Sequence, residues 1–287
     1  MAINTDASPR VEGFGERLVQ AGRTYGRLCV GIDPHPALLQ QWGLPVTADG
    51  LRTFSMLCVE AFAGNVALVK PQVAFYERFG SQGFAVLEHV LAALREAKTL
   101  VVADAKRGDI GSTMAGYAEA WLAPGSPLEA DAVTVTPYLG VGSLEPAIEV
   151  GQHHGKGLFV MAANSNPEAT EFQSATLQTH SGERSVAQFM VDECAARNAE
   201  AGAQGLVGDV GVVVGATVAD PPSCASLNAP VLLPGVGVQG ATMGDVDRIA
   251  GRHIEQAFPS VSRSILSLGP EVSDLRKEAI SLARGAV

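Results

Sequence analysis

The chain has 287 residues, of which 47% are hydrophobic and 17% charged, with a formal net charge of -10 and a pI near 5.1. This composition excludes a disordered chain, because it supplies enough apolar surface for a large core. The negative charge disfavours broad binding to nucleic acid or to an anionic membrane, since both require a basic face. An anionic ligand would therefore need a local positive pocket.

The first ten residues are polar, and nothing in them resembles the apolar core of a signal peptide. No stretch of the sequence reaches the roughly 18 uninterrupted apolar residues of a membrane span. We therefore expect a cytoplasmic protein without a membrane partner. The cysteines lie far apart, without a CxxC pair or a histidine at metal-ligand spacing, so we expect reduced, buried thiols. They are Cys29, Cys58, Cys194 and Cys224.

Eight short apolar runs follow one another along the chain, and most are separated by stretches with apolar residues three or four positions apart, the spacing of an amphipathic helix. Ser81 and Ser185 stand where helix N-caps are expected, and Gly202 stands where a helix beginning near Val186 would end. Alternating strands and helices favour a parallel sheet. The predicted strands are 28–32, 67–69, 100–103, 132–136, 158–161, 210–214, 231–233 and 260–265.

Eight such units without a linker or a shift in composition favour one α/β domain, a (β/α)8 TIM barrel over residues 1–287, rather than an open sheet with a second domain. Residues 1–20 form an N-terminal extension before the first unit. Between the fifth and sixth strands, residues 164–184 are polar and lack clear periodicity. Compact domains avoid long structureless connections, so we interpret this segment as a lid over an active site. A disordered surface insertion is the alternative.

A barrel of this kind carries its chemistry just after the strands, and polar residues occur there repeatedly in this sequence. Asp33 follows the first strand, Lys70 the second and Ser165 the fifth. Each has an ordinary explanation alone, since Asp33 could be a turn residue and Lys70 a surface lysine. Their joint occurrence at strand ends favours an active site.

The segment Asp104-Ala-Lys106-Arg-Gly-Asp109 follows the third predicted strand. Because strand side chains alternate, Asp104 and Lys106 are expected to project from the same face. A lysine flanked by acids at an apolar strand end must have its charge paired if it is buried, and such pairing is typical of sites that tune a proton donor. A solvated polar loop is the alternative interpretation of this segment.

Late in the chain, Pro234-Gly235-Val-Gly237-Val-Gln239-Gly contains the GxGxxG pattern, but its place after the seventh strand is wrong for a Rossmann fold. In barrels, the loops after strands seven and eight commonly bind phosphate through backbone N–H groups. Gln239 could add an amide donor, and Arg263, expected on the eighth strand, a bidentate guanidinium. The inferred ligand is a phosphorylated small molecule.

Taken together, these residues resemble the orotidine 5'-phosphate decarboxylase family, in particular its longer bacterial (type 2) branch, over about residues 29–265. The resemblance lies in the order and spacing of one early lysine, the Asp-x-Lys-x-x-Asp cluster and one late arginine. Residues 162–164, before Ser165, depart from the family pattern, which is more polar or basic there. The residues that carry the resemblance are Lys70, Asp104, Lys106, Asp109, Ile110, Thr113, Ser165, Pro234, Gly235, Gly237 and Arg263.

The resemblance implies a homodimer that converts orotidine 5'-monophosphate to UMP and CO2, the last step of UMP synthesis, without a metal or organic cofactor. It implies that Lys106 protonates a C6 carbanion, that Asp104 lies beside the substrate carboxylate, and that Lys70 holds Asp104 and a ribose hydroxyl. Asp109 would reach into the neighbouring site of the dimer, so the two active sites would share residues. The implied substrate contacts are Asp33, Ile110, Thr113, Ser165, Pro234, Gly235, Gly237, Gln239 and Arg263.

Two alternatives remain open at this stage. A sugar-phosphate lyase, such as ketogulonate-phosphate decarboxylase or hexulose-phosphate synthase, resembles this family in its barrel and acidic cluster but uses Mg²⁺. Lys70 stands where that metal would need a carboxylate. A catalytically silent phosphate-binding barrel is also conceivable, because a fold does not fix a function. It would bind nucleotide without turnover, and its expected signature is the loss of Asp104 or Lys106.

Overall fold

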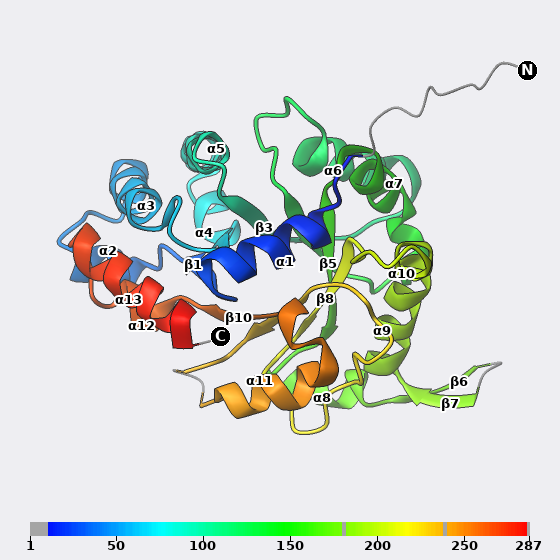
Figure 1. Ribbon diagram of the computed structural model, residues 1–287. Helices are drawn as coiled ribbons and strands as arrows, with labels where there is room; N and C mark the ends of the chain where they lie inside the picture. Colours follow the sequence, from blue (N-terminus) through cyan, green and yellow to red (C-terminus); the bar gives the residue numbers. More distant parts are fainter. Residues whose placement is uncertain (1–10, 180–181, 238–239, 286–287) are drawn as a thin grey trace, which may run out of the picture.

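The computed structural model describes residues 11–179, 182–237 and 240–285. In them, eight parallel strands close into a barrel in the order β1-β10-β9-β8-β5-β4-β3-β2, and helices surround it (Figure 1). The predicted (β/α)8 barrel is therefore confirmed. The barrel strands are β1 (Cys29–Ile32), β2 (Leu68–Pro71), β3 (Leu100–Arg107), β4 (Ala132–Val135), β5 (Gly157–Ala163), β8 (Val210–Val214), β9 (Val231–Pro234) and β10 (Ala257–Val261).

In the described part of the chain, one helix precedes the first barrel strand and two follow the last, while most of the other helices lie between successive strands and cover the outside of the barrel (Figure 1). They are α1 (Phe14–Tyr25), α2 (Pro36–Gln41), α3 (Ala48–Phe62), α4 (Ala74–Glu77), α5 (Gly80–Glu96), α6 (Gly111–Leu122), α7 (Glu145–His154), α8 (Pro167–Gln173), α9 (Val186–Arg197), α10 (Ala199–Ala203), α11 (Met243–Ala250), α12 (Arg263–Leu266) and α13 (Val272–Gly285), with 3-10 turns η1 (Val141–Leu144) and η2 (Gly251–Gln256).

One of the predicted helix boundaries is confirmed and two are wrong. The Ser185 side chain caps α9 by accepting a hydrogen bond from the N–H of Gln188. Ser81 is not a cap, because α5 already begins at Gly80. Gly202 lies inside α10, a separate short helix that follows the end of α9. Glycine and serine alone do not locate a helix end when the neighbouring residues also favour a helix.

The third strand is longer than predicted. It continues through Arg107, so Asp104 and Lys106 lie within the strand and not beyond it. The apolar run ends at Ala103 because the last part of the strand points polar side chains into the barrel mouth. In the layer below, Val102 packs in the barrel interior, and the two-residue alternation of a strand then turns Asp104 and Lys106 to the same side.

The eighth strand of the barrel is shifted from its predicted position. It spans Ala257–Val261 and not 260–265, because it begins earlier and includes Pro259. Proline is depleted in strands, which hid the beginning of this one in the sequence pattern. Arg263 is therefore not on a strand: it is the first residue of the short helix α12. Its side chain is nevertheless delivered to the same end of the barrel.

Helix α1 closes the amino-terminal end of the barrel and crosses in front of the strands in Figure 1. Phe14 and Leu18 are completely buried and belong to the same apolar cluster as the inward-facing strand residues. The Phe14 ring meets Phe159 edge to face, with ring centroids 5.8 Å apart. Within the segment predicted as an extension, residues 14–20 thus fill the base of the barrel, and residues 1–10 lie outside the described part.

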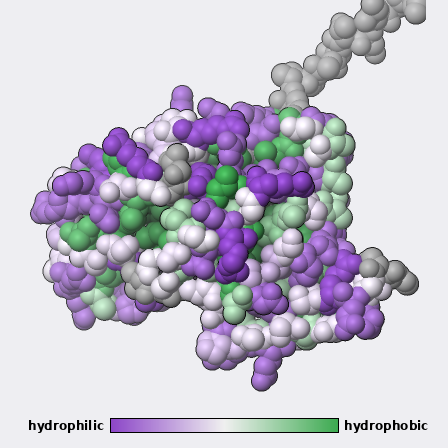
Figure 2. Space-filling model, turned by 60° about the horizontal axis from the view of Figure 1, so that its bottom comes forward, coloured by the Kyte–Doolittle hydropathy of each residue, from purple (hydrophilic) through white to green (hydrophobic). Residues whose placement is uncertain are grey.

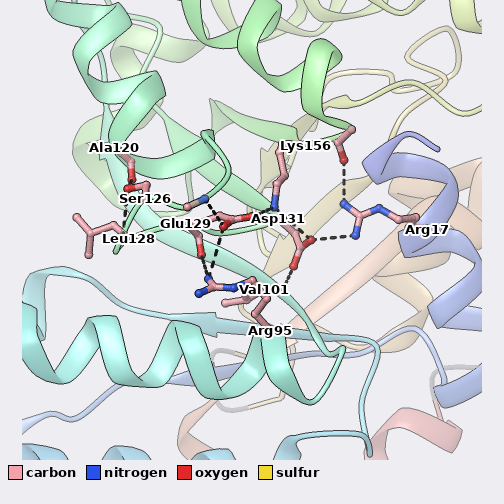
Figure 3. A network of polar contacts seen from close by, with 11 residues as sticks. Arg17, Arg95, Val101, Ala120, Ser126, Leu128, Glu129, Asp131 and Lys156 are labelled. Carbon is pink, nitrogen blue, oxygen red and sulfur yellow. Dashed lines mark hydrogen bonds and ion pairs between the residues drawn. The ribbon is translucent and has the colours of Figure 1, made fainter. Parts of the chain in front are cut away.

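A polar network fastens α1 to the same end of the barrel (Figure 3). Arg17 forms an ion pair of 2.9 Å with Asp131, whose other oxygen accepts a hydrogen bond of 3.1 Å from the N–H of Val101. The nearly buried Lys156 donates to Glu129 over 2.9 Å. Polar groups at this face of a barrel serve stability, since the chemistry lies at the opposite face.

The cysteines are free and buried, as the sequence predicted. Burial raises the pKa of Cys29, Cys194 and Cys224 to about 12, so these thiols stay protonated at neutral pH. Among the described residues, no helix has both the length and the apolar character needed to cross a bilayer. Figure 2 shows a face on which hydrophilic residues predominate and hydrophobic residues occur in separate patches.

The packing of α1 against the amino-terminal end of the barrel leads to a first prediction. Phe14→Ala is expected to lower the free energy of unfolding by about 3–5 kcal/mol, because truncating a buried aromatic ring leaves a cavity that its surroundings fill only in part. Urea denaturation measures this difference. The matched control is Val11→Ala, at a side chain that is 55% exposed, and its expected effect is below about 0.5 kcal/mol. Equal effects of the two substitutions would contradict the role of Phe14 in filling the amino-terminal end of the barrel.

Candidate active site

A cavity of about 310 Å³ opens at the carboxyl ends of the barrel strands. Its wall is formed by residues at the ends of β1, β2, β3, β4, β5, β8, β9 and β10, or directly after them. This is the place where barrel enzymes carry their chemistry. The residues predicted from the sequence that line this cavity are Asp33, Lys70, Asp104, Lys106, Ser165, Pro234, Gly235 and Arg263.

Asp104 is the centre of the polar contacts in this cavity, and its carboxylate accepts hydrogen bonds from four side chains. Oδ2 accepts from Lys70 Nζ and from Gln72 Nε2, each over 2.9 Å. Oδ1 accepts from Lys106 Nζ over 2.5 Å and from Thr134 Oγ1 over 2.9 Å. The side chain of Asp104 is only 8% exposed. Its orientation is therefore fixed before any ligand enters.

Each charged group of this cluster stabilises the ionised form of its neighbours. Burial by itself would raise the pKa of Asp104, but the ammonium groups of Lys70 and Lys106 outweigh burial and hold that pKa well below the usual range of an aspartate. Burial would likewise lower the pKa of Lys70, but the carboxylates of Asp104 and Asp33 outweigh it and raise that pKa. Asp104 and Lys70 are therefore both charged at neutral pH.

The two lysines differ in access to the cavity. The side chain of Lys70 is 9% exposed and is held by Asp104, whereas that of Lys106 is 42% exposed. Lys70 thus serves as a fixed counter-charge, and Lys106 presents an ammonium group that a ligand can reach. Of the two, Lys106 is the better placed to transfer a proton, because a proton donor must lie within hydrogen-bond reach of the reacting atom.

The backbone of Lys106 adopts a left-handed conformation, with φ of +48°. The pairing of β3 with β4 shifts register between Ala103 and Arg107, which is the signature of a β-bulge. A lysine at positive φ costs about 1–3 kcal/mol and persists only when its surroundings impose it. Such outliers cluster at active sites, and this one falls on the more exposed of the two lysines of the cavity.

Thr134 and Ser262 also organise the site, although neither was predicted from the sequence as a site residue. Thr134 accepts a hydrogen bond of 2.9 Å from the N–H of Lys106 while it donates to Asp104. Ser262 donates to Asp33 Oδ2, and the other oxygen of Asp33 is buried without a hydrogen-bond partner among the described residues. A signal for Thr134 was available, because it is the polar residue within the buried strand Ala132–Val135.

Pro234, Gly235 and Arg263 line the side of the cavity formed by β9 and β10. Gly235 has φ of +103°, a conformation that favours glycine. Gly237 does not line the cavity, and its N–H donates to the carbonyl of Ala241 over 2.9 Å within the same loop. The predicted contact at Gln239 lies outside the described residues.

Asp109, Ile110 and Thr113 are absent from the cavity wall. Asp109 and Ile110 lie in the connection from β3 to α6, Thr113 lies in the first turn of α6, and Ile110 is 61% exposed. After the neighbouring strand β4, Tyr138 and Leu139 are 76% and 55% exposed.

Residues 164–184, interpreted from the sequence as a lid, contain secondary structure that their lack of periodicity did not indicate. They contain α8, all of β6 (Thr176–Thr179) and all but the last residue of β7 (Gly182–Ser185). The strands β6 and β7 pair as an antiparallel hairpin that projects from the barrel at the lower right of Figure 1. The segment begins beside the cavity, where the N–H of Asn164 donates to Gln173 Oε1 on α8 over 2.7 Å. On the same helix, Phe172 packs against Tyr138, with ring centroids 5.8 Å apart.

The charge cluster gives a prediction about acid stability. Since the pKa of Asp104 is lower in the folded than in the unfolded chain, where it is about 3.9, its stabilising effect is present above that pH and is lost as the pH falls below it. Asp104→Asn should lower the free energy of unfolding at pH 7 by about 3–5 kcal/mol, because it leaves Lys70 as a buried, poorly paired charge.

The measurement is urea denaturation of both proteins between pH 7 and pH 3. The difference in free energy of unfolding between wild type and Asp104→Asn should be constant near neutral pH and should shrink below about pH 4. Glu60→Gln, at an exposed carboxylate, serves as the control and should change little. A difference that stays constant down to pH 3 would show that Asp104 does not gain its stabilisation from these charges.

The amino-acid sequence is similar to known proteins of one family. Residues 26–277 match the model of the orotidine 5'-phosphate decarboxylase / HUMPS family. The chain is 61% identical to the orotidine 5'-phosphate decarboxylase of Corynebacterium efficiens, over 92% of this chain and 93% of that protein. It is 58% identical to the protein of the same name from Corynebacterium glutamicum strain R, over 94% and 96% of the two chains.

Solved structures agree with these relatives. A Streptomyces avermitilis protein assigned as an orotidine 5'-phosphate decarboxylase is 48% identical, with a TM-score of 0.90 over 100% of this chain and 99% of that one. The OMP decarboxylase of Leishmania donovani is 28% identical, with a TM-score of 0.74 over 96% and 97%. This chain belongs to the orotidine 5'-phosphate decarboxylase / HUMPS family.

Proposed function

We propose that this protein converts orotidine 5'-monophosphate to UMP and CO2. The observation that carries the proposal is the Lys70–Asp104–Lys106 cluster in the barrel mouth, where a buried carboxylate is held between two ammonium groups. The names of the most similar relatives support the same activity. A role in UMP synthesis and a cytoplasmic location, both expected from the sequence, remain parts of this proposal.

Decarboxylation of this substrate leaves a carbanion at C6 that no carbonyl group can delocalise. An ammonium group close to that carbon is then both the electrostatic stabiliser and the proton source. Lys106 fits this role, because it is the exposed ammonium of the cluster and is held by Asp104 at 2.5 Å. After CO2 departs, the C6 lone pair takes a proton from Lys106 Nζ, which leaves UMP and a neutral amine that solvent reprotonates.

Asp104 would lie beside the substrate carboxylate, and Lys70 would keep Asp104 ionised. The repulsion between the two carboxylates disappears when CO2 leaves, although how far such ground-state effects accelerate enzymes is contested. A large enzymatic acceleration corresponds to about 20 kcal/mol, whereas one well-placed donor supplies about 3–4 kcal/mol. Binding of the remote parts of the substrate must therefore contribute to catalysis as well.

The remaining cavity residues fit the rest of the nucleotide. The phosphate would bind between Gly235 and Arg263, where a guanidinium can donate two hydrogen bonds to phosphate oxygens. Asp33, with one oxygen that accepts no hydrogen bond from the described residues, would accept from a ribose hydroxyl. Ser165 would contact the edge of the pyrimidine. Pro234, Gly237 and Gln239 remain predicted contacts of the same substrate.

The protein would act as a homodimer with shared active sites. Asp109, Ile110 and Thr113 do not reach the cavity of their own chain, and Ile110 is largely exposed. A twofold dimer buries the same patch on both subunits, so these residues of each subunit could complete the cavity of the other. Residues 164–184, which begin at the cavity, would then act as the lid that closes over the bound nucleotide.

The Mg²⁺-dependent sugar-phosphate reactions of the wider family fit this site less well. Lys70 would repel a divalent cation from the end of β2. Within the described residues, no three His, Cys, Asp or Glu side chains gather in a way that could hold a metal. A silent phosphate-binding barrel is disfavoured by the intact Asp104 and Lys106, since such a protein would have no need of a buried charge cluster.

The first test follows the ultraviolet absorbance of orotidine 5'-monophosphate with the purified wild-type protein, with and without EDTA. Conversion to UMP at the same rate in both conditions is expected. Lys106→Ala should lower turnover by at least roughly 10³-fold, within the range that a positioned proton donor contributes. Turnover that EDTA abolishes would favour the metal-dependent reactions, and wild-type turnover in the variant would remove Lys106 from the mechanism.

The shared active site can be tested by mixing subunits. Lys106→Ala and Asp109→Asn homodimers should each be inactive. Unfolding and refolding them together in equal amounts should restore about one quarter of the wild-type activity, because half of the dimers are mixed and each mixed dimer has one intact site. Refolding each variant alone is the control. No recovery in dimers shown to be mixed would place Asp109 in the active site of its own chain.

A further inference from the structure

Arg107 follows the proposed proton donor in the sequence, but its side chain points away from the cavity. It lies on the outer face of β3, where its guanidinium packs over the rings of Tyr117 and Trp121 on α6, 5.8 and 5.7 Å from their centroids. It also forms an ion pair with Glu77 at the end of α4. Arg107 thus joins the active-site strand to two helices that cover it.

The same guanidinium also holds the backbone next to Lys106. Its NH1 donates to the carbonyl of Ala105 over 2.9 Å. The N–H of Lys106 belongs to the same peptide group as this carbonyl, and it donates to Thr134 Oγ1 over 2.9 Å. Both polar ends of the Ala105–Lys106 peptide are therefore fixed, one by Arg107 outside the barrel and the other by Thr134 inside it.

The orientation of this peptide determines the conformation of Lys106. The φ angle of Lys106 is the rotation about the bond that directly follows the peptide, and its value is +48°. A lysine does not hold this angle unless its surroundings impose it. Without Arg107, this peptide would keep its hydrogen bond to Thr134 but lose the one at its carbonyl, and Lys106 could relax to an ordinary strand conformation that moves its ammonium away from Asp104.

We propose that Arg107 is a positioning residue: it fixes the Ala105–Lys106 peptide from outside the barrel and thereby holds Lys106 in its left-handed conformation. The catalytic consequence of this proposal rests on the proposed function. Its structural part, that Arg107 fixes the Ala105–Lys106 peptide, does not depend on that function. It assigns Arg107 a role in proton transfer without contact with the substrate.

The test compares Arg107→Ala with Arg17→Gln. Arg17 is a matched control, because it also binds one carboxylate, that of Asp131, and one backbone carbonyl, that of Gly155, at similar burial. It does so at the opposite end of the barrel. Arg107→Ala should lower kcat by roughly 10- to 100-fold, as a small misplacement of a reacting group does, while KM and the affinity for UMP stay within about threefold. Arg17→Gln should leave kcat unchanged.

Two further measurements separate positioning from a loss of stability. Guanidinium ion at non-denaturing concentration should restore part of the kcat of Arg107→Ala, and urea, which has a similar shape but no charge, should not. Hydrogen exchange at the Lys106 amide should become at least about tenfold faster in Arg107→Ala and not in Arg17→Gln, because the peptide has lost one of its two anchors. This second readout does not depend on activity.

The outcomes are distinct. Failure of the wild-type protein to decarboxylate would refute the proposed function, and the amide exchange would still decide the role of Arg107. An active wild type with an equally active Arg107→Ala, or unchanged exchange at Lys106, would overturn the inference. If Arg107→Ala does not fold, Glu77→Gln removes only the partner of the guanidinium, and it should show the same pattern with a smaller loss of kcat.

Discussion

The structure of the site depends on one buried carboxylate that must stay ionised. Removing a charge from water costs several kcal/mol unless opposite charges and hydrogen bonds replace the lost hydration. Asp104 obtains both from Lys70 and Lys106, and its remaining acceptor capacity is filled by Gln72 and Thr134. None of these donors could be removed without leaving a charge or a polar atom poorly paired.

The barrel makes this arrangement possible because it places neighbouring strand ends side by side. Lys70 lies on β2, Asp104 and Lys106 on β3, and Thr134 on β4, and these three strands are adjacent in the closed sheet. Parallel strands end at the same face, so donors from three separate chain segments reach a single carboxylate. The opposite end of the barrel is filled by α1 and its ion pairs, which supplies stability away from the chemistry.

Some residues of the site touch the cavity, and others hold those residues in place. Lys106 needs an unfavourable backbone angle, and Thr134 and Arg107 hold the peptide before it from opposite sides of the strand. Strain at a functional residue persists only where the surrounding contacts impose it. The contacts that hold the site in place therefore extend through Arg107 on β3 to helices α4 and α6 outside the barrel.

The sequence by itself determined the fold and the charged residues of the cavity. Alternating apolar runs and helical spacing indicate a (β/α)8 barrel, and a barrel sends strand ends to one face, so Asp33, Lys70, Asp104 and Lys106 could be expected together from their positions alone. The shifted last strand shows the limit of such patterns: Pro259 obscured its beginning, and Arg263 was consequently assigned to a strand and not to a helix.

Only the tertiary structure decided which residues hold the others. Thr134, Ser262 and Arg107 act through partners that lie far away in the sequence or on other elements, and no periodicity reports such pairs. The left-handed angle of Lys106 was equally hidden, because a lysine carries no sequence signal for positive φ. Local patterns record which face a residue occupies, whereas hydrogen-bond partners and backbone strain arise only when separate segments pack together.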